Sequence, residues 1–309
     1  MKSVTLATSS AFVVPDLSIL NNNPILSFKA SLQPGAIGLN TNAQKIISQA
    51  HDYKFDAIAP LLEEIVLYSS NQVENYLDKM ESHNLVFDAA GLPIQFRTNE
   101  ETFKKGFDQL KSNLPILSKL NIPGFVTWIM PTNNIFSYTE NFELHKVRLK
   151  QVANLLNDYN MRLGLEYVGP KTLMIRDKFA FIHTILELRI LIDSIQENNV
   201  GYLLDSFHMY CSEDTASDYD FITENDIVSV QINDAISGKN PSQQMDLDRD
   251  LPGSTGVIDL KAFLSLIQMK GYKGCVSVEP FNKKVNDMDE KEKLEAVSNS
   301  IFETFKKLI

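Results

Sequence analysis

Short apolar runs alternate with longer amphipathic segments along the chain from Ile25 onward. The runs predict eight β-strands, at residues 25–30, 57–59, 85–88, 124–128, 161–166, 200–204, 227–232 and 274–279. The segments between them have the apolar spacing of helices. In the clearest one, apolar residues recur at helical spacing, with Asp259 at the position of an N-cap and Gly271 beyond the end: Leu260, Phe263, Leu264 and Ile267.

Regular alternation of strands and helices predicts an α/β fold. Eight strand–helix units in about 285 residues fit a (β/α)8 TIM barrel with insertions. The alternative is a doubly wound open sheet, which would carry a glycine-rich phosphate-binding turn after its first strand. Residues 34–38 (PGAIG) lack that pattern, and no linker composition divides the chain. Residues 25–309 are therefore predicted to form a single barrel domain.

The first 24 residues need a separate interpretation. Lys2 is followed by the mildly apolar stretch Val4–Val14 and then by the polar run Asn21–Asn23. This order indicates either a degenerate export signal or an N-terminal arm outside the barrel. The expected location is cytoplasmic by default, with a periplasmic or exported protein as the alternative.

Composition and charge narrow the classes of partner. The chain has 309 residues, 29 Lys and Arg against 39 Asp and Glu, and a net charge of -10. Such a surface repels nucleic acids and anionic lipids. The two cysteines, Cys211 and Cys275, lack the spacing of a metal motif, and no apolar run is long enough to span a bilayer. We expect a small-molecule substrate, no nucleic acid, no membrane span and, by analogy with other barrel enzymes, a homo-oligomer.

Polar residues mark the ends of the four last predicted strands. Three carboxylates and one carboxamide stand at these positions: Glu166, Asp205, Gln231 and Glu279. In a barrel the carboxyl ends of all strands meet in one mouth. One such carboxylate alone would be interpreted as a salt-bridged strand end, but a group of them predicts one divalent cation. Oxygen ligands favour Mn²⁺ or Mg²⁺, with Co²⁺ as a further candidate, and the lack of Cys or several His ligands disfavours zinc.

Six short motifs follow one another in the order of a known family. The chain resembles the sugar phosphate isomerase/epimerase family of the xylose isomerase-like TIM barrels from about Ser31 to the C-terminus. The motifs are GLEYVGPK (164–171), LDSFH (204–208), VQIND (230–234), LPGSTG (251–256), GY (271–272) and VSVEPF (276–281). The resemblance implies Glu166, Asp205, Gln231 and Glu279 as metal ligands. Many members have His where this chain has Gln231, a departure that blurs the substrate.

Such a site can move protons on an α-hydroxycarbonyl compound. A divalent cation acidifies the C–H bond between the two oxygens by stabilising an enediolate. Glu166 and Glu279 can act as acid and base, and the family resemblance implies the same roles. The predicted function is that of a metal-dependent isomerase or epimerase of a sugar or small hydroxyketo compound. Two alternatives remain, a dehydratase of the 3-dehydroshikimate type and an inactive carbohydrate-binding barrel.

Four further residues are candidates for contacts with the substrate. His208 resembles a substrate-contacting histidine of the family, or it orients Asp205. Arg249 binds hydroxyls or a carboxylate of the substrate, or forms a local ion pair. Lys171 meets an anionic group. Trp128 forms an apolar wall or is plain packing. His145 is interpreted as a helix surface residue without a role.

Overall fold

The computed structural model describes residues 28–308 and contains a closed ring of parallel strands. The main sheet has the order β3-β2-β1-β11-β10-β9-β7-β5-β4. Every neighbouring pair in it is parallel. The strands are β1 (Lys29–Leu32), β2 (Ala57–Ile58), β3 (Val86–Phe87), β4 (Ala90–Gly91), β5 (Gly124–Ile129), β7 (Arg162–Tyr167), β9 (Val200–Asp205), β10 (Ile227–Ile232) and β11 (Cys275–Val278). The predicted barrel is confirmed.

The ring closes through a single stretch of chain. β3 pairs with β2, whereas β4 pairs with β5. Only two residues, Asp88 and Ala89, separate β3 from β4. The two ends of the sheet order are thus two halves of one bent strand, so eight strand positions surround the barrel axis. A separate two-stranded antiparallel sheet joins β6 (Thr132–Asn133) to β8 (Phe179–Ala180).

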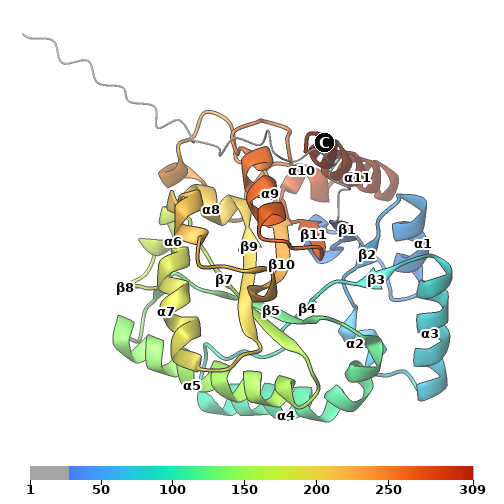
Figure 1. Cartoon of the computed structure of the whole chain (residues 1–309), viewed down its shortest axis with the longest axis horizontal. Coiled ribbons are helices and arrows are strands. Elements are labelled where there is room, and N and C mark those ends of the chain that lie inside the picture. Colours follow the sequence, from blue (N-terminus) through green and yellow to red (C-terminus); the bar gives the residue numbers. More distant parts are fainter. Residues whose placement is uncertain (1–27, 309) are drawn as a thin grey trace, which may run out of the picture.

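Helices surround the ring of strands (Figure 1). They are α1 (Lys45–Asp52), α2 (Leu62–Ile65), α3 (Ser70–Ser82), α4 (Glu100–Leu117), α5 (Tyr138–Asn157), α6 (Lys171–Met174), α7 (Ile185–Ile195), α8 (Ser206–Ser212), α9 (Leu260–Met269), α10 (Lys283–Asn286) and α11 (Glu290–Lys306). Short 3-10 helices also occur, of which η1 (Gly35–Ile37) follows β1.

The helix α9 buries the apolar stripe that the sequence predicts for it. Leu260, Phe263, Leu264 and Ile267 of α9 are all buried. The Asp259 side chain accepts the backbone N–H of Ala262 and caps the helix. Full burial of one such side chain contributes about 1.5–3 kcal/mol to folding, so this stripe fixes α9 on the barrel.

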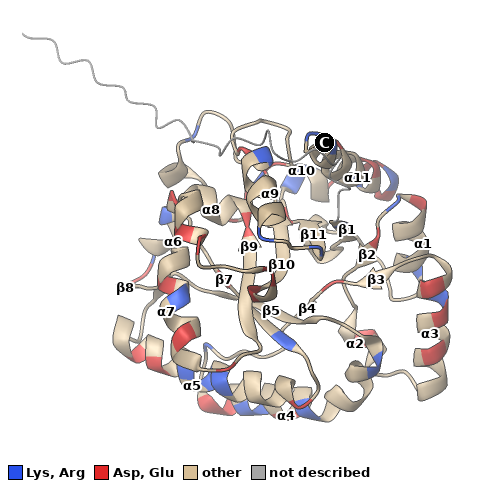
Figure 2. Cartoon of the chain, in the orientation of Figure 1, with Lys and Arg blue, Asp and Glu red and all other residues tan. Residues whose placement is uncertain are grey.

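Acidic and basic side chains of both signs occupy the outer helices. In Figure 2, both red and blue residues occur on the outer helices α4, α5 and α7. Charges of both signs suit a solvated helix surface. None of the helices within residues 28–308 is long and apolar enough to cross a membrane. The arm at residues 1–24 lies outside the described residues.

Candidate active site

Four strand ends bring the predicted ligands to one level of the barrel mouth. Glu166 lies in β7, Asp205 ends β9, Gln231 lies in β10 and Glu279 follows β11. Asp205 is the register partner of Gln231, which in turn pairs with Ser277. The four strands are consecutive in the sheet, so the two glutamates stand at the two ends of a row.

Arg249 lies at the centre of this row. Its Nη1 is 2.8 Å from Oδ2 of Asp205 and 3.4 Å from Oε2 of Glu279, and its Nη2 is 2.8 Å from Oδ1 of Asp246. The arginine side chain is 2% exposed and that of Asp205 is fully buried. Three carboxylates therefore share one buried guanidinium, which offsets part of the cost of keeping them out of water.

The loop that carries Arg249 is fixed at several points. Asp234 and Asp250 exchange backbone hydrogen bonds of 2.8 Å, and Asn282 Nδ2 donates to the carbonyl of Arg249. The guanidinium carbon lies 4.7 Å and 5.2 Å from the ring centroids of Phe207 and Phe281. Such cation–π contacts hold the guanidinium in place from its faces. Phe281 has a φ of 43°, an unfavourable conformation that puts its ring beside the arginine.

Asp234 anchors the next turn of the same loop. Its carboxylate accepts backbone N–H groups from five residues, which are Ala235, Thr255, Gly256, Val257 and Ile258. The side chain has no exposed surface. These hydrogen bonds hold the LPGSTG motif against the end of β10. The motif therefore has a structural role, which is to place its backbone N–H groups around the Asp234 carboxylate.

Asn233 connects two of the predicted ligands. Its Nδ2 donates to both carboxylate oxygens of Asp205 at 3.2 Å, and its Oδ1 accepts the backbone N–H of Glu279 at 2.9 Å. Asn233 is fully buried. It therefore orients the Asp205 carboxylate and fixes the start of the segment after β11.

His208 enters the mouth from α8, one turn beyond Asp205. Its Nδ1 lies 3.4 Å from the backbone N–H of Gly169, and its Nε2 lies 3.5 Å from Nη2 of Arg249, so each ring nitrogen faces an N–H donor. Nε2 is 3.6 Å from Oε1 of Glu166 and 3.9 Å from Oδ1 of Asp246. Burial, opposed by Asp205, lowers the pKa of His208 to about 4, so the ring is neutral at neutral pH.

Both glutamates hold their protons more tightly than free carboxyl groups. Burial, together with the charges of Glu279 and Asp205, raises the pKa of Glu166 well above its ordinary value. Burial also raises the pKa of Glu279 to about 7, against the opposing effect of Arg249. Carboxyl groups with raised pKa values in a shared cleft are typical of proton-transfer sites.

The residues present fit a divalent cation. Oε1 of Glu166 and Oε1 of Gln231 are buried and have no hydrogen-bond partner among residues 28–308, so two oxygens are available to a cation. Ligand atoms of Glu166, Asp205 and His208 lie within 4.8 Å of one another. Two members of this group, Glu166 and Asp205, are metal ligands predicted from the sequence. The third, His208, is predicted from the sequence to contact the substrate.

Two of the predicted substrate contacts lie at or beyond the rim. Lys171 forms an ion pair with Glu213, and its side chain is 39% exposed. Trp128 is 48% exposed and is the register partner of Glu166 on the neighbouring strand. Trp128 therefore stands beside the row formed by Glu166, Asp205, Gln231 and Glu279, called here the carboxylate row. The charge of Lys171 is already paired. Both assignments stay predictions.

Three residues near the mouth or in the core were missed or misread from the sequence. Asp246 and Asn233 contact Arg249 and Asp205, but only the polar end of the VQIND motif hinted at Asn233. His145 is buried rather than on the surface, because its ring packs against Phe96 and Phe181. The helical spacing alone did not show which face of α5 meets the β4–α4 segment.

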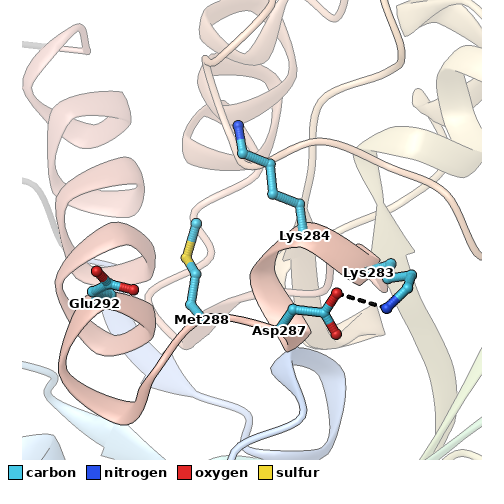
Figure 3. A pocket seen from close by; sticks show the side chains of 5 residues that line it. All are labelled: Lys283, Lys284, Asp287, Met288 and Glu292. Atoms are coloured by element: carbon cyan, nitrogen blue, oxygen red, sulfur yellow. Dashed lines mark hydrogen bonds and ion pairs between the residues drawn. The ribbon is translucent and has the colours of Figure 1, made fainter.

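A surface pocket of 580 Å³ lies apart from these residues, between α10 and α11. Lys283 turns toward Asp287 there, 2.6 Å away, while Glu292 projects from the other helix (Figure 3). Lys284 and Met288 complete its lining. None of the predicted site residues lines this pocket.

The fold and the mouth define an α/β barrel with an acidic, strand-end site. The chain belongs to the xylose isomerase-like TIM barrel family, whose model matches residues 47–301. The family and the fold predicted from the sequence are both confirmed.

Named relatives are isomerases and epimerases. An inosose isomerase of Halalkalibacterium halodurans is 23% identical over 209 residues, which are 68% of this chain and 71% of the relative. A xylose isomerase domain protein from Alicyclobacillus acidocaldarius aligns with a TM-score of 0.79 and 22% identity, over 90% of this chain and 98% of that one.

Two further solved structures share the fold. The IOLI protein with a bound zinc atom has a TM-score of 0.76 and 19% identity, over 91% of this chain and 99% of that one. The 3-keto-D-glucoside 4-epimerase of E. coli has a TM-score of 0.69 and 17% identity, over 91% and 99%. At these identities the structures show a common fold. The zinc in one of them differs from the Mn²⁺ or Mg²⁺ that the sequence predicts here.

Proposed function

We propose that this protein is a divalent-metal-dependent isomerase or epimerase of a sugar or small hydroxyketo compound. The observation that carries the proposal is the row of four strand ends, with Glu166 and Glu279 at its two ends and Asp205 and Gln231 between them. The names of the relatives, inosose isomerase and 3-keto-D-glucoside 4-epimerase, support it.

Glu166, Asp205, Gln231 and Glu279 would hold the cation. When bound, it supplies positive charge that stabilises an enediolate formed from the substrate. The ion would be Mn²⁺ or Mg²⁺ because all four of these ligands offer oxygens, with Co²⁺ as a further candidate. Asn233 keeps Asp205 in place through its two 3.2 Å hydrogen bonds.

The two glutamates move the proton. One takes it from the carbon next to the carbonyl, and the other returns a proton from the opposite end of the row. Return to the other face of the same carbon gives an epimer, and return to the neighbouring carbon gives the aldose–ketose isomer. In the tautomer that carries its proton on Nε2, His208 can donate that proton in a hydrogen bond to a substrate oxygen.

Burial shields most of the carboxylate row from water. Glu166, Asp205 and His208 are 6%, 3% and 1% exposed, whereas the side chain of Glu279 is 19% exposed. A proton held by Glu166 is therefore shielded from solvent more than a proton held by Glu279. Arg249 sets the charge balance, because it neutralises part of the negative charge of Asp205, Asp246 and Glu279.

Solvent-proton exchange tests this function. The Mn²⁺-loaded chain is incubated in D₂O with inosose and a panel of ketoses and hydroxyketo acids, and deuterium at the carbon next to the carbonyl is followed by NMR. An isomerase or epimerase incorporates deuterium together with product. Loss of water with a conjugated, ultraviolet-absorbing product would instead identify a dehydratase. Binding without exchange on any of these compounds would contradict the proposal and favour a carbohydrate-binding barrel.

A further inference from the structure

Arg97 is a cation near the mouth that has no carboxylate partner among residues 28–308. It lies in the segment between β4 and α4, and it makes no ion pair there, whereas Arg249 and Arg148 each contact at least one acid. Glu100, which begins α4 three residues further on, pairs with Arg148 instead. Burial lowers the pKa of Arg97 to about 10, with no acid raising it again. A partly buried charge without a counter-charge is costly, so its presence calls for an explanation.

Two aromatic rings hold the guanidinium of Arg97. Its central carbon lies 4.2 Å from the ring centroid of Phe96 and 4.5 Å from that of Trp128. Nη2 donates to Oγ1 of Thr127 at 3.0 Å and to the carbonyl of Trp128. These contacts fix one end of the group at the carboxyl end of β5.

The other N–H groups of Arg97 remain available. Nε is buried and has no hydrogen-bond partner in the described chain. Nη1 makes no hydrogen bond to the described residues either. Because both hydrogens of Nη2 are already donated, an anion at this position would be bound through Nη1, which can donate to an oxygen of a carboxylate or phosphate.

The position of Arg97 relates it to the carboxylate row. Trp128, on which Arg97 stacks, is the register partner of Glu166, and neighbouring strands lie about 4.8 Å apart. The acidic residues of the mouth lie on the side of β7, β9, β10 and β11, so Arg97 stands at the opposite, β5 side of Glu166. A small molecule can thus present its hydroxyketone to the glutamates and an anionic end to Arg97.

We propose that Arg97 and Trp128 form an anion subsite, and that the substrate is a hydroxyketo compound with a carboxylate or phosphate group. The inference rests on the proposed function, which it deepens by naming the charge of the substrate. The subsite takes the role that the sequence assigned to Lys171, whose charge is paired with Glu213. The chemistry shared by both anions is a pair of negatively charged oxygens on one centre.

Trp128 provides the readout, because it is the only tryptophan of the chain. Its fluorescence is titrated with inorganic phosphate and, separately, with glycolate, at constant ionic strength and in the full chain. We expect a saturable change in emission for at least one of them. Arg97→Gln should raise the Kd about tenfold or more, since hydrogen bonds to charged groups contribute about 1.5–3 kcal/mol. The anion that binds more tightly distinguishes a sugar phosphate from a sugar acid.

Arg189→Gln is the matched control. Arg189 also stacks on an aromatic ring, at 4.3 Å from the centroid of Phe221, but it pairs with Asp193 on the outer helix α7. This variant should bind as the wild type does. No saturable response in the wild type, or an equal Kd in Arg97→Gln, would overturn the subsite. If Arg97→Gln does not fold by circular dichroism, Arg97→Met decides, because its flexible apolar side chain can still pack against the two rings and an unchanged Kd without the charge would also overturn the subsite.

The binding test and the proposed function can fail separately. Fluorescence titration requires no turnover, so a saturable and Arg97-dependent response supports the subsite even where deuterium exchange is absent. Conversely, deuterium exchange on neutral sugars, together with no fluorescence response to either anion, would support the isomerase function and contradict the proposal of an anionic substrate.

Discussion

Arg249 and Asp205 form a buried ion pair at the centre of the barrel mouth, with 2.8 Å between Nη1 and Oδ2. Although burial alone would lower the pKa of Arg249, Asp205 and Asp246 raise it, so the guanidinium is permanently charged. In the absence of a metal ion, this arginine is the positive charge that the carboxylate row faces. Removing it leaves buried carboxylates without a counter-charge.

Arg249→Met should therefore destabilise the metal-free protein by about 3–5 kcal/mol. Added Mn²⁺ should restore part of this loss, because it offers positive charge to the same carboxylates. Urea unfolding with and without the metal measures both effects. Arg148→Met is the control, since Arg148 is buried and pairs with Glu100 away from the row. Equal recovery by metal in both variants would contradict the placement of Arg249 at the cation site.

Glu279→Gln should weaken metal binding and abolish deuterium exchange with little change in stability. Removal of one proton-transfer group costs about 10²–10⁴-fold in rate. Glu166→Gln should have the same effect, because the two residues act in turn. Glu213→Gln serves as the control, since this exposed carboxylate pairs with Lys171 outside the row. A fully active Glu279→Gln variant would remove that residue from the mechanism.

His145 should make the protein less stable in acid. Burial, opposed by a hydrogen bond to the carbonyl of Asn141, lowers the pKa of His145 to about 4, whereas the unfolded chain has a value of about 6.5. The unfolded state thus binds more protons between these values. The contribution of the neutral ring is complete above pH 6.5 and is lost as the pH falls toward 4, by up to about 3 kcal/mol.

The pH dependence of urea unfolding, compared between wild type and His145→Gln, isolates this contribution. His208 titrates in the same direction in both proteins, so it cancels in the comparison. The variant should lose less stability than the wild type between pH 6.5 and 4. Parallel pH profiles would show that His145 is not held neutral by the fold.

Gly169→Ala should displace His208. A Cβ at Gly169 would lie 2.4 Å from the backbone oxygen of His208 and 3.1 Å from the amide of Ser212. Relief of this clash separates the β7–α6 loop from α8, and overpacking of this kind costs about 1–3 kcal/mol. We expect a higher KM as well as a lower midpoint of urea unfolding. Gly35→Ala has free space around the new Cβ and should change neither value.

The barrel strands between residues 57 and 279 followed from the sequence because their apolar runs are continuous and bounded by turns, whereas the short strands β6 and β8 were not predicted. The predicted first strand, residues 25–30, lies in part outside the described residues, and β1 extends beyond its predicted end to Leu32 because Lys29 and Ser31 interrupt the apolar pattern. The bend at Asp88 that divides the third strand also has no local signal.

The position of Glu166, Asp205, Gln231 and Glu279 at neighbouring strand ends was predictable because register and burial follow from the strands themselves. The contacts of Arg249 were not, as they depend on how the long β10–α9 loop folds back over the mouth. The same holds for Arg97, whose isolation from acids arises from segments far apart in the chain. Its neighbours Thr127 and Trp128 lie 30 and 31 residues away. Spacing along the sequence carries no information about such pairs.

Metal content tests the central claim most directly. The purified chain and its Glu166→Ala variant are loaded with Mn²⁺, freed of loosely bound ions and assayed by elemental analysis. The account predicts one tightly bound ion per wild-type chain and loss of that ion in the variant. No retained ion in either protein would contradict it, because the strand-end carboxylates would then be ordinary partners of Arg249.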